Sequence, residues 1–293
     1  MTGRWVVLFG GSGFVGRHLA PRLAAEGWTV RVASRHARPE AASAAGGVMA
    51  VTADLGEEDQ VRRAVTGAEA VINLVGIARE REASFEAVHV AGVARVARLA
   101  AAAGVRRLLH VSALGIAEDA PAAADRTKAR GEAAVRAAFP TATLVRPSLI
   151  YGPGDHFFSR FAAMTMTSPV LPIIGGGRTR FQPLHIADAV RTLQALLERP
   201  ETAGATFALV GPETFTFRAL LERLLAGLGR RRPILPLTRE EVRLLRTDKV
   251  ANRLPTRAAP VMDHGRAAET TRRTGCAHRA RPAKNARATS KRA

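Results

Sequence analysis

The sequence predicts an α/β protein built on a doubly wound parallel sheet. Apolar runs alternate with amphipathic segments through the first half of the 293 residues. The runs 5–9 and 70–75 are almost continuous in apolar residues, which is typical of strands buried on both faces of a sheet. A glycine-rich turn joins the first run to the first helical pattern, and right-handed crossovers are expected to connect the strands.

Taken in order, strands are expected at residues 5–9, 29–34, 48–51, 70–75, 107–112 and 142–146. Apolar residues at helical spacing predict helices after the glycine turn and over 57–65, 85–103 and 126–138. Beyond Pro147 the alternation weakens, and helices are expected at 156–167, 186–197, 217–228 and 238–247, with a short strand at 207–210. We therefore expect a dinucleotide-type domain over 1–150, to which 184–198 returns, and a smaller α/β lobe over 151–250.

Composition restricts the function classes. The formal net charge is +19, and the segment 251–293 supplies almost half of it while holding few large apolar residues. This basic tail is expected to be disordered and solvated rather than an arm for an anionic partner, and no nucleic-acid module accompanies it. The single cysteine, Cys276, excludes an internal disulfide. With no apolar run of membrane-spanning length and no leader pattern, a cytoplasmic location is expected.

The segment Gly10–Gly16 reads Gly-Gly-Ser-Gly-Phe-Val-Gly and stands between a strand and a helix. This is the order that a dinucleotide site requires. Gly10 allows a sharp turn, Gly13 allows the backbone to approach a pyrophosphate, and Gly16 allows close helix packing. The helix N-terminus then offers free N–H groups to the phosphates.

The end of the second strand indicates which dinucleotide is bound. NAD sites usually carry a carboxylate there for the ribose hydroxyls. This chain has Ser34-Arg35-His36 instead, and a guanidinium suits a 2′-phosphate. With Arg17 at the helix start as a second donor, the sequence favours NADP(H) over NAD(H).

Five motifs in this order resemble the extended and atypical short-chain dehydrogenases/reductases, which have a Rossmann-type fold. They are GGSGFVG at 10–16, ADL at 53–55, HVSALG at 110–115, TKARGE at 127–132 and RPSLIYGPGD at 146–155. The resemblance implies a Ser-Tyr-Lys set in which Ser112 and Lys128 match the serine and the lysine. The tyrosine position, four residues before the lysine, holds Ala124. A methyl group cannot transfer a proton, so the resemblance implies binding without general acid–base catalysis.

The only tyrosine of the chain, Tyr151, lies in the YGPGD motif, where the resemblance places the wall on the substrate side. It is an outside candidate for the missing phenol. His110 is expected in the core, and His185 is expected to pack between the lobes.

Segments 157–161, 168–183 and 237–248 resemble one branch of this superfamily, the nucleotide-binding accessory subunits of respiratory complex I and their bacterial relatives. That branch lacks the catalytic tyrosine and holds NADPH as a structural ligand. The resemblance implies an accessory or assembly protein that contacts complex I subunits at the membrane surface. It implies the inner face of the membrane in a bacterium, or the matrix side in a mitochondrion.

The expected dinucleotide contacts follow the chain from the glycine turn to the nicotinamide end. They are Gly10, Gly11, Ser12, Gly13, Phe14, Val15, Gly16, Arg17, Arg35, Asp54, Leu55, Asn73, Leu74, Val75, Ser112 and Lys128. No metal ligands are expected. Two alternatives stay open: an active NADP-dependent reductase or NAD-dependent epimerase/dehydratase-like enzyme using Tyr151, and a regulator that senses NADPH against NADP+.

The absence of a carboxylate after the second strand makes a direct prediction. In a titration of the purified protein with both dinucleotides, NADP+ is expected to bind more tightly than NAD+, because Arg35 can pair with the 2′-phosphate. Tighter binding of NAD+ would refute this assignment.

Overall fold

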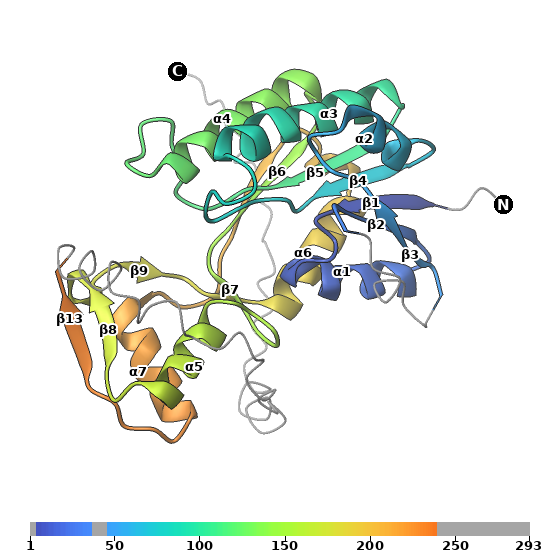
Figure 1. Ribbon diagram of the computed structural model, residues 1–293. Helices are drawn as coiled ribbons and strands as arrows, with labels where there is room; N and C mark the ends of the chain where they lie inside the picture. The colour runs from blue at the N-terminus through green and yellow to red at the C-terminus, as the bar shows by residue number, and fades with distance from the viewer. Residues whose placement is uncertain (1–3, 37–45, 239–293) are drawn as a thin grey trace, which may run out of the picture. The chain divides into compact units, whose positions relative to one another are not determined.

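A computed structural model describes residues 4–36 and 46–238 of the chain. Its main sheet has seven strands in the order β11-β6-β5-β4-β1-β2-β3, with every neighbouring pair parallel (Figure 1). These strands are β1 (Trp5–Phe9), β2 (Thr29–Ser34), β3 (Val48–Thr52), β4 (Ala70–Asn73), β5 (Arg107–Val111), β6 (Thr143–Pro147) and β11 (Thr206–Leu209). The predicted doubly wound α/β fold is confirmed.

Helices cover both faces of this sheet (Figure 1). One face carries α1 (Phe14–Ala25) and α6 (Ile186–Glu198), and the other carries α2 (Glu58–Val65), α3 (Val93–Ala102) and α4 (Ala123–Ala138). Alternate residues of β1 divide between the two cores: Val6 and Leu8 pack toward α1 and α6, whereas Val7 and Phe9 pack toward α2, α3 and α4. Burial on both faces explains why the strand is apolar throughout.

A second group of elements follows β6. It contains α5 (Phe158–Thr167), α7 (Phe217–Gly227), a short 3-10 turn (Gly175–Gly177) and three strand pairs. A second 3-10 turn, Pro200–Thr202, joins α6 to β11 at the main sheet. The pairs are β7 (Ile150–Tyr151) with β10 (Leu184–His185), β9 (Arg180–Phe181) with β12 (Phe215–Thr216), and β8 (Leu171–Ile174) with β13 (Ile234–Leu237). The expected helix 238–247 and the basic tail 251–293 lie outside the described residues, apart from Thr238.

The structure corrects two expectations about strands. The short strand expected at 207–210, within the smaller lobe, is β11 (Thr206–Leu209), which pairs with β6 and forms the edge of the main sheet. The strand expected over 70–75 ends at Asn73, because the Asn73 side chain turns the backbone by accepting a hydrogen bond from the Val75 N–H at 3.1 Å. The pattern of apolar residues predicts neither the pairing of β11 with β6 nor the end of β4 at Asn73.

The helix expected over 85–103 is interrupted. Residues Ala87–Gly92 form a π-helical segment, η2, before α3 begins. Helix α4 packs against this segment at Gly131, where an added Cβ would overlap the His89 carbonyl oxygen. A π-segment often lies at a functional site, and here it adjoins the helix that carries Lys128.

An ion pair between a buried carboxylate and a half-exposed guanidinium joins α4 to the sheet. The Glu132 carboxylate accepts two hydrogen bonds from Arg146 Nε, at 3.0 and 3.1 Å, and one from Arg146 Nη2, at 2.6 Å. The Glu132 side chain is only 5% exposed, and its hydrogen bond and charge raise the pKa of Arg146. Since loss of Arg146 would leave the Glu132 charge buried without its partner, this contact holds α4 against β6.

The close approach at Gly131 gives a stability prediction. Gly131→Ala is expected to lower the free energy of unfolding by about 1–3 kcal/mol or more, because the new methyl group must displace the His89 backbone. Gly227→Ala is the matched control, since Gly227 is also helical and has open space at its Cβ position. Urea titrations of both variants would measure this. A Gly131→Ala midpoint equal to that of the control would contradict the close approach.

Candidate functional site

The turn between β1 and α1 has the geometry of an anion cradle. Gly10 adopts a φ of +76°, and its backbone lies so close to the next strand that a Cβ would stand 3.2 Å from the Val75 nitrogen. A Cβ on Gly16 would overlap the Gly11 carbonyl. Gly13 is the N-cap and offers no capping side chain, and the first turn of α1 holds no acidic residue. The N–H groups of Gly10, Gly11 and Gly13 donate to backbone carbonyls and fix the turn. Those at the start of α1 have no partner within the helix and are available to phosphate oxygens.

The predicted residues of this turn divide into two groups. Ser12 and Gly13 are exposed at the turn. Phe14 and Val15 are half-buried and pack against the core between the sheet and α1 and α6. Through their side chains they hold the helix start, so a contact of these two residues with phosphate would come from the backbone.

The two arginines assigned to the 2′-phosphate have different partners. The Arg17 Nη2 lies 3.5 Å from the Gly154 carbonyl oxygen, in the YGPGD motif. The Arg35 Nη1 lies 2.7 Å from the Glu82 Oε2. Both side chains remain accessible enough to exchange these partners, but the structure does not bring the two guanidinium groups to one shared acceptor.

Asp54 and Leu55 form the turn that follows β3. The Asp54 carboxylate accepts a hydrogen bond from the Gly56 N–H at 2.8 Å, and the Asp54 N–H donates to the Gln60 side chain at 3.0 Å. Leu55 is buried, and its carbonyl accepts from Arg95. The side chain of Asp54 thus shapes this turn.

Asn73 lies at the end of β4 with its side chain 1% exposed. Its amide nitrogen lies 3.1 Å from His110 Nδ1, and its oxygen accepts from the Val75 N–H. Leu74 and Val75 pack on opposite cores. Asn73 therefore acts by fixing the course of the 74–75 segment, whose backbone adjoins Gly10. His110 is buried as expected.

The Ser112 side chain carries a buried polar group whose hydrogen-bonding capacity the described residues do not satisfy. Its hydroxyl oxygen is buried and has no hydrogen-bond partner among residues 4–36 and 46–238. Its backbone N–H is satisfied by the Val145 carbonyl at 2.7 Å, so only the hydroxyl is left over. Since buried polar groups are normally paired, this hydroxyl indicates a polar ligand or ordered water.

Lys128 stands one turn after Ala124 on α4. Burial lowers the pKa of its ammonium, and Asp125 offsets this only in part. A partly desolvated ammonium gains from nearby hydroxyl acceptors such as those of a ribose. Together with the Ser112 hydroxyl and the glycine cradle, it fits the polar groups of a nicotinamide dinucleotide.

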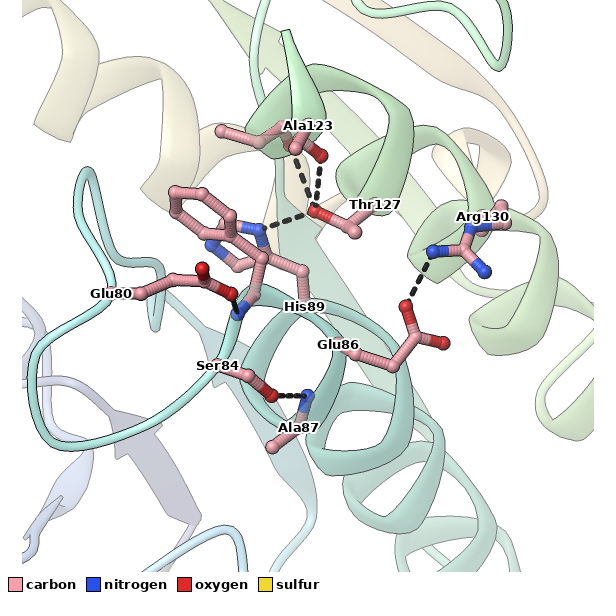
Figure 2. A network of polar contacts seen from close by, with 10 residues as sticks. Glu80, Ser84, Glu86, Ala87, His89, Ala123, Thr127 and Arg130 are labelled. Atoms are coloured by element: carbon pink, nitrogen blue, oxygen red, sulfur yellow. Dashed lines mark hydrogen bonds and ion pairs between the residues drawn. The ribbon is translucent and has the colours of Figure 1, made fainter.

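The sequence analysis did not find a buried chain of hydrogen bonds that runs from His89 through Thr127 to Ala123 (Figure 2). The Ile77 N–H donates to His89 Nε2 at 3.0 Å, and His89 Nδ1 lies 3.0 Å from the Thr127 hydroxyl. Because Nε2 accepts, the neutral ring carries its proton on Nδ1 and donates it to Thr127 Oγ1. That hydroxyl in turn donates to the Ala123 carbonyl at 2.9 Å. Burial, followed by the charge of Lys128, lowers the pKa of His89 and favours this neutral form.

Tyr151 does not have the setting of an activated phenol. Its ring meets Phe158 and His185 edge-on, with centroids 5.9 and 5.3 Å away. Burial and the charge of Asp188 raise its pKa, whereas a neighbouring cation would lower it. His185 caps α6 by accepting from the Ala187 N–H at 3.3 Å, which gives it a structural role.

The groups available to a dinucleotide thus lie at the ends of five neighbouring strands, β1 to β5. One turn before Lys128, α4 carries the methyl group of Ala124. Among the described residues, no cluster of His, Cys, Asp and Glu has the makings of a metal site. Within the same residues, no helix combines the length and apolar character needed to cross a bilayer.

Comparison with known proteins identifies the family of this chain. The sequence pattern of the NAD dependent epimerase/dehydratase family matches residues 6–210, and the chain belongs to this family. Its fold is shared with the dTDP-glucose 4,6-dehydratase DesIV of Streptomyces venezuelae, solved with NAD, with a TM-score of 0.70 at 20% identity over 80% of this chain and 84% of that chain. The epimerase Mth375 of Methanothermobacter thermautotrophicus matches with a TM-score of 0.70 at 19% identity, over 82% and 81% of the two chains.

Sequence relatives place the chain more narrowly. It is 32% identical over 232 residues to the mitochondrial NADH dehydrogenase (ubiquinone) 1 alpha subcomplex subunit 9 of Dictyostelium discoideum, covering 77% of this chain and 64% of that protein. The 40 kDa subunit of NADH-ubiquinone oxidoreductase of Neurospora crassa is 31% identical over 79% of this chain and 62% of its own length. These matches confirm the predicted kinship with complex I accessory subunits.

A third sequence relative is named as an enzyme and not as a subunit of complex I. The ceramide reductase of Caulobacter vibrioides is 37% identical over 196 residues, which is 67% of this chain and 61% of that protein. The chain spans less than two thirds of the length of each of these three sequence relatives.

The burial of His110 predicts a pH dependence of stability. Burial lowers its pKa from the ordinary value of 6.5 to about 4. The unfolded chain therefore takes up a proton at this site before the folded protein does, so stability is lost as pH falls from about 6.5 to about 4. The loss from this one group amounts to roughly 3 kcal/mol at pH 4.

His110→Asn tests this, because the Asn oxygen can accept from Asn73 as Nδ1 does but does not titrate. The variant is expected to be less stable at neutral pH but to lose less stability between pH 6.5 and 4 in urea titrations. Parallel pH profiles for the two proteins would contradict the assignment.

Proposed function

We propose that this chain is an NADP(H)-binding accessory or assembly protein of the complex I type, which holds the dinucleotide without redox turnover. The observation that carries the proposal is Ala124, one turn before Lys128 on α4. A methyl group stands at the position from which this superfamily's phenol would transfer a proton. General acid–base catalysis typically contributes about 10²–10⁴-fold to a rate, so its loss leaves slow turnover at best.

Binding is supported by residues that this loss leaves intact. The glycine cradle at 10–16, the orphaned Ser112 hydroxyl and the partly desolvated Lys128 ammonium would hold the pyrophosphate and the nicotinamide ribose. When bound, the cofactor would supply a nicotinamide ring able to carry a hydride. The protein's own groups would orient that ring without the tyrosine phenol that this superfamily uses to transfer the proton.

The choice of NADP(H) rests on charge. Arg35 follows β2 where a carboxylate would favour NAD(H), and Arg17 stands at the start of α1. The residues bordering the adenosine would be Asp54 and Leu55, and those along the cofactor beyond β4 would be the backbone of Asn73, Leu74 and Val75.

The proposed partners come from the relatives. Kinship with subunits of NADH dehydrogenase over most of the chain supports docking onto complex I subunits at the membrane surface. The location would be the inner face of a bacterial membrane, reached from the cytoplasm, or the matrix side in a mitochondrion.

The likeness to the ceramide reductase favours one second candidate, an NADP-dependent reductase. In that case Tyr151 would have to supply the proton, despite its raised pKa. A ceramide-type lipid is then the substrate class to test.

One experiment separates the two candidates. Native mass spectrometry of the purified protein is expected to show one bound NADPH or NADP+, and added NADPH is expected to persist when carbonyl compounds and ceramide-type lipids are supplied. The nicotinamide absorbance measures this persistence. Rapid oxidation of NADPH that Tyr151→Phe abolishes would establish the reductase instead, and a protein that takes up no dinucleotide would refute both.

A further inference from the structure

The loop between β4 and η2 reaches back across the sheet to Arg35. Glu82, in this loop, places its Oε2 2.7 Å from the Arg35 Nη1, although the two residues are 47 positions apart. Their side chains are 50% and 71% exposed. A carboxylate thus sits on the guanidinium that the proposed function assigns to the 2′-phosphate.

The base and the tip of this loop are held differently. At the base, the Ile77 N–H donates to the buried His89 ring at 3.0 Å. Nearer the tip, the Phe85 N–H donates to Glu80 Oε1 at 2.7 Å and closes the segment that contains Glu82. The tip is held through Glu82 and Arg35 in an exposed pair, which contributes little stability and is screened by salt. The tip can therefore leave Arg35 while the base stays in place.

Carboxylate and phosphate compete for the same donors. The guanidinium fork fits either group, but a phosphate carries more charge and more acceptor oxygens than a carboxylate. A ribose 2′-hydroxyl has no charge with which to compete.

We propose that Glu82 is a specificity-determining residue: it occupies Arg35 until the 2′-phosphate of NADP(H) displaces it. A dinucleotide with a 2′-hydroxyl leaves the Arg35–Glu82 pair in place. This inference rests on the proposed NADP(H) site and adds that the Glu82 carboxylate competes with the 2′-phosphate for Arg35. The carboxylate lowers the affinity for NADPH by the strength of one exposed ion pair and leaves the affinity for NADH nearly unchanged.

Glu82→Gln tests the proposal in the full chain. Isothermal titration calorimetry is expected to show NADPH binding about two- to fivefold more tightly than to the wild type, the range that one exposed ion pair can supply. The dissociation constant for NADH is expected to change much less. Since the pair is exposed, the variant should keep the thermal midpoint of the wild type nearly unchanged.

Glu86→Gln is the matched control. Glu86 pairs with Arg130 and lies four positions from Glu82, so the variant makes the same change in net charge without touching Arg35. Equal tightening of NADPH binding in the two variants would overturn the proposal, because it would reduce the effect to general charge.

A double-mutant cycle with Arg35→Ala supplies the second readout. In that background, Glu82→Gln is expected to leave NADPH affinity unchanged, since the guanidinium is absent. An effect that persists there, or no effect of Glu82→Gln in the wild type, overturns this inference alone. A wild type that binds NADH more tightly than NADPH, or binds neither, overturns the proposed function and this inference with it.

Discussion

The close contact between α4 and the π-helical segment η2 is the constraint on which the rest of the site depends. At Gly131 the two backbones lie so near that a methyl group would overlap the His89 carbonyl. The same contact brings the His89 ring to Thr127, the residue before Lys128. One turn further along α4, Glu132 holds Arg146 of β6. The direction of Lys128 therefore follows from packing on both sides of its helix.

The residues of each superfamily motif divide between those that hold the fold together and those that the core contacts leave over. In TKARGE, Thr127, Gly131 and Glu132 build the helix contacts, whereas Lys128 is an ammonium whose pKa is lowered by burial. In HVSALG, His110 pairs with Asn73 inside the core, while the Ser112 hydroxyl is left without a partner in the described part of the chain. The supporting residues remain although Ala124 stands at the tyrosine position. The contacts that position α4 therefore do not depend on a tyrosine at position 124.

Much of this was readable in the sequence because it is local. Parallel strands buried on both faces, the Gly10–Gly16 turn and the methyl group at Ala124 each depend on residue type and spacing along the chain. The kinship with complex I accessory subunits likewise followed from ordered motifs and is confirmed. The binding roles of individual residues stay predictions.

The sequence by itself determined the doubly wound class, the position of the glycine turn and the methyl group of Ala124 four residues before Lys128. Only the tertiary structure decided that β11 closes the edge of the main sheet, that His89 supports α4, and that Glu82 meets Arg35. The physical reason is separation along the chain. Each of these contacts joins residues 38 to 62 positions apart, and no local periodicity specifies which distant surfaces will meet.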